Sequence, residues 1–393
     1  MRGNTAERNV YMKAYLDNGA TTKVDERVVE AMMPYFTETY GNASSLHTPG
    51  QEAKSGLEQS REIIAKRINA KSDEIIFTSG GTESDNLAVK GYVYANKDKG
   101  NHIITTKIEH HAVQYTCKSL EKEGFKVTWL DVDKEGFVDL KKLSSAITDM
   151  TLLVTVIHGN NEIGTLQDIS AIGKICDENK VAFHIDAVQS FTKVPIDVVS
   201  QKVTMASFSA HKIHGPKGIG ALYVKKGTIL KKLNDGGGQE SNLRGGTENV
   251  AGAVGFAKAV QLSTEQECKK MEKLRDNFIN QVEKEIPEVK LNGPRRMRLC
   301  NNANIIFKFI EGEGMLIKLD DRGIAVSTGS ACSSRDLTPS HVLTAIGVPH
   351  ALAHGSIRFT LSRFTTKEEL DYTVDNLKVM VKELREISPL WKR

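Results

Sequence analysis

Short, continuous apolar runs alternate with segments of helical periodicity between about residue 75 and residue 224. A continuous apolar run is typical of a strand buried on both faces, whereas a half-exposed strand alternates apolar and polar positions. This alternation of strands and helices predicts an α/β fold with a mostly parallel sheet that helices cover on both faces. The expected strands are 75–78, 103–106, 126–132, 152–157, 181–185, 203–208 and 219–224, and the expected helices pass through residues 86 and 90 and cover 110–123 and 169–178.

The regular alternation of strands and helices ends at about residue 265. A long charged amphipathic helix is expected over 265–285, followed by strands at 303–309, 324–327 and 356–361 and a last helix over about 367–386. This order indicates an α+β unit, and a chain of 393 residues is long enough for two cores. We expect an N-terminal extension at 1–13, a large domain at 14–264 whose first residues can pack with the small domain, and a small domain at 265–393.

Composition and charge narrow the classes of function. The chain has 53 Lys and Arg against 49 Asp and Glu, and a net charge of +4 over this length indicates no nucleic-acid or membrane partner. No apolar run reaches the length of a membrane span, and residues 1–13 lack the apolar core of a signal peptide, so a cytoplasmic location is expected. The five cysteines form no C-x-x-C pair, which is typical of a reducing compartment. Cys117, Cys176, Cys268 and Cys300 are expected to be chemically inert.

Two charged residues follow predicted buried strands. Lys212 comes after 203–208, before a glycine-rich turn, and Asp186 ends the run 181–185. Ligands bind at the carboxyl edge of a parallel sheet. There the Lys212 amine could form a Schiff base, and a buried Asp186 carboxylate would need a cationic partner. Each has an ordinary alternative: its own segment favours Lys212 as a surface lysine, and Asp186 fits equally well as a helix N-cap.

Three further positions suit a flat, anionic ligand. Residues 79–82 form a strand-to-helix junction whose amides and hydroxyl suit a phosphate. His110 opens a helix and can stack on a ring or move a proton, and Arg358 has the planar fork that suits a carboxylate. A glycine turn, a structural histidine and an edge-strand arginine are the open alternatives. His211 and His214 lie three apart, but no third ligand follows at a recognisable spacing, so a metal site is not favoured.

Cys332 differs from the other cysteines. It lies within residues 327–334, where nearly every residue is small, and Pro339 follows. Such a stretch cannot form a core, and we expect an exposed loop. A thiol on such a loop is available as a nucleophile when its thiolate is stabilised. A chemical role for Cys332 is therefore favoured over a structural one.

The joint order of these segments resembles that of the cysteine desulfurases of the NifS/IscS type. The resemblance covers about residue 14 to the C-terminus and rests on Y-L-D-N-G-A-T-T (15–22), T-S-G-G-T-E-S-D-N (78–86), H-G-N-N-E-I-G (158–164), H-I-D (184–186), S-A-H-K (209–212), R-G-G-T (244–247) and G-S-A-C (329–332). It implies a homodimer of the pyridoxal-phosphate (PLP) dependent transferase fold type I, with a seven-stranded sheet in the large domain. It also implies conversion of L-cysteine to L-alanine, with sulfur passed to Cys332 as a persulfide and supplied to iron–sulfur cluster assembly on a scaffold protein of the IscU type.

The resemblance also implies a role for individual residues. Lys212 would carry the Schiff base, Asp186 would pair with the pyridine nitrogen, and Cys332 would accept sulfur. The other implied cofactor-binding residues are Gly81, Thr82, His110 stacked on the ring, Asn161, Gln189 at the ring hydroxyl, Ser209, His211, and Thr247 from the neighbouring subunit. Asn161 and Arg358 would receive the substrate carboxylate, and His110 would move a proton at the substrate thiol. Cys332 is a candidate iron–sulfur ligand in the complex with the scaffold, and no other metal ligand is expected.

The resemblance leaves two kinds of alternative. The first is another PLP enzyme of the same fold, a selenocysteine lyase or a class V aminotransferase. The second is a non-catalytic partner in sulfur transfer, which the presence of Lys212, Asp186 and Cys332 disfavours. Gly81 and Gly159 stand where many members of the family carry a larger residue.

Overall fold

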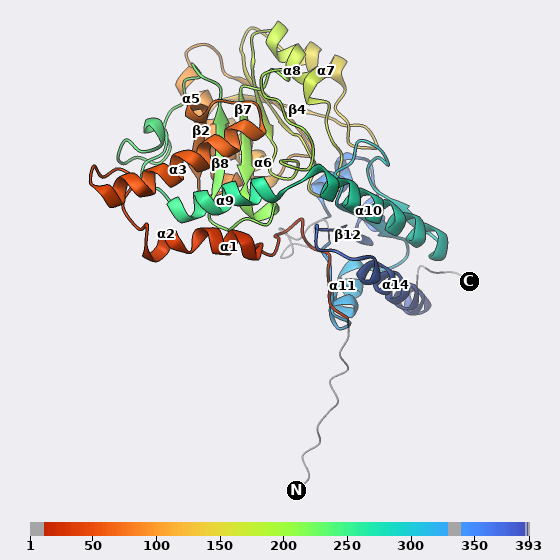
Figure 1. Cartoon of the computed structure of the whole chain (residues 1–393). Coiled ribbons are helices and arrows are strands. Elements are labelled where there is room, and N and C mark those ends of the chain that lie inside the picture. Colours follow the sequence, from red (N-terminus) through yellow and green to blue (C-terminus); the bar gives the residue numbers. More distant parts are fainter. Residues whose placement is uncertain (1–11, 329–338, 390, 392–393) are drawn as a thin grey trace.

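A computed structural model describes residues 12–328, 339–389 and 391 of the chain. Its centre is a seven-stranded sheet of order β2-β8-β7-β6-β5-β3-β4 (Figure 1). The strands are β2 (Ile75–Thr78), β3 (His102–Thr106), β4 (Lys126–Leu130), β5 (Thr151–Ile157), β6 (Ala182–Asp186), β7 (Met205–Ser209) and β8 (Gly220–Val224). All seven expected strands are present, which confirms the α/β fold and the count that the resemblance implied.

The sheet is mixed at one point. Strands β4, β3, β5, β6 and β7 pair in parallel, whereas β8 is antiparallel to both β7 and β2. The link from β7 to β8 covers only residues 210–219. A parallel return needs a crossover of about a dozen residues or more, so this short link reverses the chain instead.

Both faces of the sheet are buried, which explains the continuous apolar runs. Along β2, Ile75 and Phe77 join one hydrophobic core and Ile76 joins the other. The first core lies under the helices α3 (Thr48–Arg67), α8 (Ile169–Glu178) and α9 (Val250–Leu262), and α3 and α9 cross the sheet side by side in Figure 1. The second core lies under the π-helical turn (Leu87–Gly91) that continues α4 (Gly81–Asn86), under α5 (Tyr92–Asn96) and under α6 (His111–Lys122).

The C-terminal part has its own core. The strands β9 (Val289–Leu291), β10 (Asn302–Phe307) and β12 (Ser356–Thr360) form an antiparallel sheet of order β12-β10-β9. The helices α10 (Glu265–Glu285), α11 (Gly312–Asp320) and α14 (Lys367–Ile387) pack with it, and α12 (His341–Ala345) and α13 (His350–Ala353) lie between α11 and β12 in the chain. Thr264 and Thr366 each close a capping box with a glutamate three positions on, which sets where α10 and α14 begin.

The N-terminal segment packs with this second core. β1 (Ala14–Tyr15) pairs in parallel with β11 (Ile324–Ala325), and Leu16 belongs to the same hydrophobic cluster as Phe278 and Phe359. The division of the chain at residue 264 stays a prediction. After β1 the chain passes into α1 (Glu26–Met32) and α2 (Pro34–Thr37), and α7 (Leu140–Ala146) lies between β4 and β5 in the chain.

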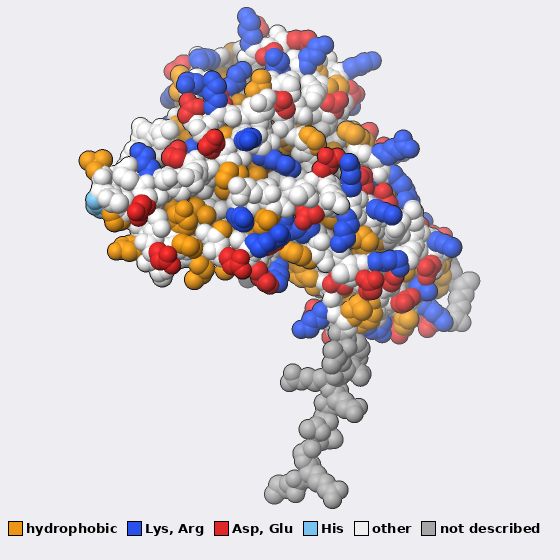
Figure 2. All heavy atoms as spheres, viewed as in Figure 1, with side chains coloured by type: hydrophobic (Ala, Val, Ile, Leu, Met, Phe, Trp, Pro, Cys, Tyr) orange, Lys and Arg blue, Asp and Glu red, His pale blue; other side chains and the backbone are white. Residues whose placement is uncertain are grey.

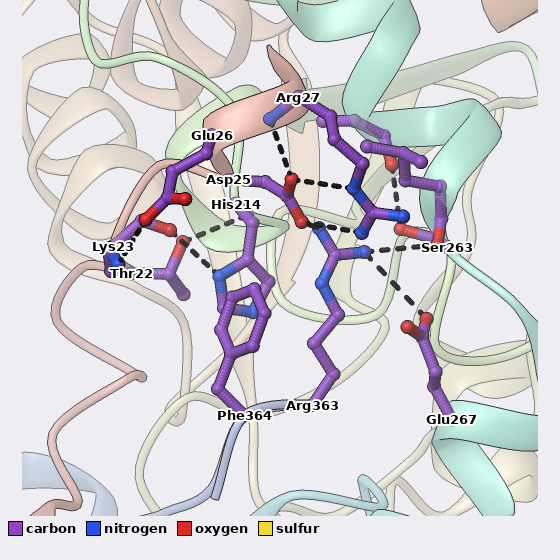
Figure 3. A network of polar contacts seen from close by, with 12 residues as sticks. Thr22, Lys23, Asp25, Glu26, Arg27, His214, Ser263, Glu267, Arg363 and Phe364 are labelled. Carbon is purple, nitrogen blue, oxygen red and sulfur yellow. Dashed lines mark hydrogen bonds and ion pairs between the residues drawn. The ribbon is translucent and has the colours of Figure 1, made fainter. Parts of the chain in front are cut away.

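A polar network joins the two parts at the start of α1 (Figure 3). Asp25 and Arg363 are each 5% exposed at the side chain and pair at 2.7 Å, and Arg363 also donates to the carbonyl of Leu262. Asp25 accepts two hydrogen bonds from the Arg27 guanidinium as well. Arg363 therefore has its charge satisfied by a carboxylate from the other end of the chain.

Replacing Asp25 by alanine is expected to destabilise the protein by about 3 kcal/mol, because it leaves the buried Arg363 guanidinium with only the more distant carboxylate of Glu267, at 3.7 Å, as a counter-charge. The midpoint of urea unfolding measures this effect. The matched control is Asp131→Ala, which removes an ion pair of similar length, Lys107–Asp131 at 2.6 Å, between two exposed side chains. The control should leave the midpoint nearly unchanged. Equal effects of the two variants would contradict the prediction.

Among the described residues, none of the helices is both long enough and apolar enough to span a bilayer.

Candidate active site

A cavity of about 270 Å³ lies at the carboxyl ends of β5, β6 and β7. Ten of the residues that the sequence pointed to line it: Gly81, Thr82, His110, Asn161, Asp186, Gln189, Ser209, His211, Lys212 and Arg358. They come from segments as far apart as residues 81 and 358, and this edge is where ligands bind in α/β folds. Thr247 is exposed and is not among the lining residues. Cys332 lies outside the described residues.

Lys212 ends the 3₁₀ turn Ala210–Lys212 that follows β7. Its Nζ donates hydrogen bonds of 2.7 Å to the carbonyl of Gly19 and 2.8 Å to the carbonyl of Ala20. The motif at 15–22 thus has a structural reason: after β1 the chain crosses to the sheet edge and supplies two acceptors that hold the amine in the cavity.

Two buried carboxylates face each other in the cavity. Oxygen atoms of Asp186 and Asp85 and a ring nitrogen of His110 all lie within 4.8 Å of one another. Burial raises the pKa of Asp186 to about 6, and burial together with the nearby Asp186 charge raises the pKa of Asp85 well above its usual value. Asp85 Oδ1 is buried and has no hydrogen-bond partner in the described part of the chain. Two such groups stay charged only when a cation or a strong donor joins them.

This pair fits the ring nitrogen of PLP. A protonated pyridine nitrogen is a cationic N–H donor, which is the kind of group that an orphaned buried carboxylate oxygen requires. The three ligand atoms of Asp85, His110 and Asp186 could also hold a metal ion. The amine of Lys212 and the guanidinium of Arg358 line the same cavity, and these cations favour a ligand that carries anionic groups.

His110 is the N-cap of α6. Its Nδ1 accepts the amide hydrogen of Ala112 at 3.2 Å, so the neutral ring carries its proton on Nε2. Burial, helped by the nearby Lys212 charge, lowers the pKa of His110 to about 4. The ring is therefore neutral at pH 7, as stacking on a cationic ring requires, and its remaining proton can be donated to an anion.

The start of α4 and the end of β7 form the region expected to hold a phosphate. A Cβ atom added to Gly81 would lie 2.6 Å from Cγ2 of Val188, so a larger residue at position 81 would require the Val188 side chain to shift. Nδ1 of His211 lies 3.1 Å from Oγ1 of Thr21. Burial, followed by the nearby Lys212 charge, lowers the pKa of His211 to about 4, so the ring binds as a neutral donor or acceptor.

Arg358 reaches the cavity from β12 in the C-terminal part. Its Nη2 pairs with Asp17 at 3.0 Å and its Nη1 donates to the carbonyl of Asn161 at 3.1 Å. Its Nε is buried and has no partner within the described residues. Arg358 is 4% exposed as a residue, its guanidinium is fixed in orientation, and further N–H groups are available to an incoming carboxylate.

Sequence reasoning missed three buried acids, of which Asp85 and Glu162 line the cavity and Glu109 precedes His110 in the chain. Asp85 has the clearest signal, because it follows Gly81 by four positions and so lies on the same helical face. Glu109 accepts from Oγ1 of Thr106 and from the amide of Ile157, and burial raises its pKa to about 8. Glu162, whose pKa burial raises to about 7, accepts the hydroxyl of Ser340. Nothing in the local sequence marks Glu109 or Glu162 as buried.

Comparisons with known proteins agree with this geometry. The family model described as aminotransferase class V matches residues 14–373, so the chain is a member of the class V aminotransferase family. Over 386 residues the chain is 53% identical to a protein named cysteine desulfurase IscS from Dictyoglomus turgidum, covering 97% of this chain and 98% of the relative. The chain belongs to the cysteine desulfurase branch of the class V aminotransferase family.

Solved structures of similar proteins extend the match to three dimensions. A NifS-like protein aligns with a TM-score of 0.89 at 39% identity, over 95% of this chain and all of that one. A structure described as SspA in complex with cysteine aligns with a TM-score of 0.81 at 38% identity, over 90% of this chain and all of that one. The resemblance drawn from the sequence motifs is confirmed.

Proposed function

We propose that this protein is a PLP-dependent cysteine desulfurase that passes the sulfur of L-cysteine to its own Cys332. The main support for this proposal is that one cavity contains the amine of Lys212, two facing carboxylates and the guanidinium of Arg358. The membership of this chain in the cysteine desulfurase branch supports the same activity. A selenocysteine lyase or an aminotransferase would share the cavity, but an aminotransferase has no use for a thiol at residue 332.

Different residues of the cavity would hold different parts of the cofactor. Lys212 would hold its aldehyde carbon, Asp186 and Asp85 its ring nitrogen, Gln189 its ring hydroxyl and His110 its ring face. Gly81, Thr82, Ser209 and His211 would hold its phosphate, with Thr247 of a neighbouring subunit. Bound there, PLP supplies an electron sink for the bond between the substrate α-carbon and its hydrogen.

The chain's own groups perform the other steps. Arg358 and Asn161 orient the substrate carboxylate, and Lys212, once its amine is released, removes the α-proton. The Cys332 thiolate attacks the substrate sulfur, so an S–S bond forms as the C–S bond of cysteine breaks. His110 donates the proton on Nε2 or receives the substrate thiol proton, and protonation of the remaining carbon yields L-alanine.

The proposed partners are a second copy of the chain and a scaffold protein of the IscU type. Hydrophobic side chains gather over α1, α2 and the segment before α3 at the lower left of Figure 2, and this set comprises Met33, Phe36, Tyr40 and Leu46, each at least 52% exposed. Apolar patches of this kind mark interfaces. The exposed Thr247 supports the same arrangement, because it would serve the site of the second copy. A cytoplasmic location is supported by the free thiols of Cys117, Cys176, Cys268 and Cys300.

Replacing Arg358 by lysine is expected to raise the KM for cysteine about 10- to 100-fold, because a point charge cannot reproduce a bidentate contact with a carboxylate. The visible absorbance of the bound cofactor should stay unchanged. Steady-state kinetics over a range of cysteine concentrations measure the effect. A normal KM with a lowered kcat would contradict the assignment to substrate binding.

The activity itself is tested by supplying the purified protein with PLP and L-cysteine. The proposal predicts a yellow protein that forms L-alanine in step with sulfur released to a reductant. Selenocysteine tested in parallel separates a lyase from a desulfurase. Alanine formation from selenocysteine alone, or an amino-group transfer to a keto acid without sulfur release, would overturn the proposal.

A further inference from the structure

An acidic side chain contacts the arginine that is proposed to bind the substrate carboxylate. Oδ1 of Asp17 lies 3.0 Å from Nη2 of Arg358, and the two side chains are 21% and 5% exposed. Arg358 lines the active-site cavity, whereas Asp17 is not among the described residues that line it. A negative charge at this place weakens the attraction of Arg358 for a second carboxylate, so any benefit of the contact to substrate binding must come from geometry.

The contact helps to fix the plane of the Arg358 guanidinium. Nη1 of Arg358 donates to the carbonyl of Asn161 at 3.1 Å, so two separate segments of the chain hold the two terminal nitrogens. A guanidinium has five N–H groups, and these two contacts leave others for a ligand. An arginine that is already oriented loses less side-chain freedom when a carboxylate binds to it.

The main chain of Arg358 is fixed independently of Asp17. The amide of Arg358 donates to the carbonyl of Ser327 at 2.7 Å, and its carbonyl accepts the amide of Ser327 at 3.3 Å. Arg358 is also paired with Asn304 of β10 within the sheet. Loss of the Asp17 side chain is therefore expected to release the Arg358 side chain and to leave β12 in place.

Asp17 itself has a fixed position, because it begins a turn at residues 17–20 that is bound to the end of β12. The carbonyl of Asp17 accepts the amide three positions on at 3.0 Å. The amide of Gly19 donates to Oγ1 of Thr360 at 2.7 Å. A Cβ atom added to Gly19 would lie 3.1 Å from Cγ2 of Thr360 and 3.4 Å from Cζ of Arg358, so the turn packs directly against the arginine.

The same turn holds the amine of Lys212. The carbonyls of Gly19 and Ala20 accept hydrogen bonds from its Nζ at 2.7 and 2.8 Å, and the carbonyl of Gly19 also accepts from Nε2 of Gln189 at 2.9 Å. In the proposed reaction, Lys212 removes the proton from the α-carbon that bears the carboxylate bound by Arg358. One turn therefore contacts both groups whose relative position decides whether the substrate is correctly placed.

We propose that Asp17 is a positioning residue for the substrate. From the turn that also holds the amine of Lys212, its carboxylate orients the Arg358 guanidinium to receive the carboxylate of cysteine. This role deepens the proposed function and rests on it. Asp17 acts through Arg358 and does not touch the substrate, so its loss should weaken substrate binding and spare the chemical steps.

Asp17→Ala is expected to raise the KM for cysteine about 10-fold, the effect of losing one charge-assisted hydrogen bond that orients the arginine. The value of kcat should change by less than about three-fold, because the lost interaction serves binding rather than the transition state alone. The visible absorbance of the bound cofactor should be unchanged, since the carbonyls that contact Lys212 belong to the main chain of the turn.

Asp17→Asn separates orientation from charge. The asparagine side chain keeps an oxygen that can accept the hydrogen bond from Nη2 of Arg358, so KM should stay within about three-fold of that of the unchanged protein. The matched control is Glu26→Ala, which removes an ion pair of similar length in the same N-terminal segment. That pair joins Lys23 and Glu26 at 3.1 Å between exposed side chains, and KM should not change.

A double variant tests whether Asp17 acts through Arg358. In the Arg358→Lys background, Asp17→Ala should raise KM by no more than about two-fold, because the guanidinium that it orients is already gone. Two residues that act independently would multiply their effects, and a further 10-fold rise in this background would overturn the proposal.

The measurements use the full-length protein loaded with PLP. Steady-state alanine formation gives KM and kcat, and the cysteine concentration that half-saturates the change in visible absorbance reports binding without turnover. A normal KM in Asp17→Ala, a lowered KM, or an equal loss in Asp17→Ala and Asp17→Asn would overturn the orienting role while the proposed function stood. An unchanged protein that neither changes its absorbance nor forms alanine with cysteine would overturn the proposed function and the role of Asp17 with it.

Discussion

Lys212→Ala is expected to abolish the visible absorbance of the bound cofactor and to lower the rate of alanine formation by about 1,000-fold or more. Lys212 is the one lysine among the described residues that line the cavity, and its amine is already held there by the carbonyls of Gly19 and Ala20. Its loss removes both the covalent attachment and the base for the α-proton. Absorbance spectra and alanine formation in the presence of added PLP measure the two effects separately.

The control for Lys212 is the nearby lysine at 217, which is exposed in the turn after it. Lys217→Ala should keep both the absorbance and the rate. If Lys212→Ala retained the absorbance band, or if both variants lost it equally, Lys212 would not be the attachment point.

Cys332→Ala is expected to keep the cofactor absorbance and its response to cysteine while losing persulfide formation. The variant retains every described residue of the cavity, so binding and proton removal continue, but residue 332 has no thiol to accept the sulfur. Absorbance spectra with and without cysteine measure the first half of this prediction, and persulfide labelling measures the second. The control is Cys268→Ser under reducing conditions, which removes a half-buried thiol outside the cavity and should keep the normal rate. Normal release of sulfide by Cys332→Ala would contradict the role of Cys332.

The strands and the edge at which the site lies were predictable from the sequence. Strands such as 75–78 are buried on both faces, and burial on both faces requires a continuous run of apolar residues in the sequence. Lys212, Asp186 and His110 follow the ends of such strands, and the carboxyl ends of parallel strands meet at one edge. For this reason, residues whose sequence segments each gave only weak evidence of a site line the same cavity.

Other features depend on tertiary context. Helix α9, residues 250–262, went unpredicted because its sequence is apolar and small on nearly every side, so no amphipathic period marks it. The reversal of β8 follows from the length of a connection rather than from a residue pattern. Glu109 and Glu162 look like ordinary surface acids in the sequence, and only the packing of distant segments buries them.

The most direct test of sulfur transfer is mass spectrometry of the intact holoprotein after brief incubation with L-cysteine, alkylation and digestion without reductant. Trypsin places Cys332 on residues 323–335, apart from every other cysteine. The account predicts that this peptide gains one sulfur atom, and that Lys212→Ala prevents the gain. An added sulfur on any other cysteine peptide, or none on residues 323–335 while alanine accumulates, would contradict it.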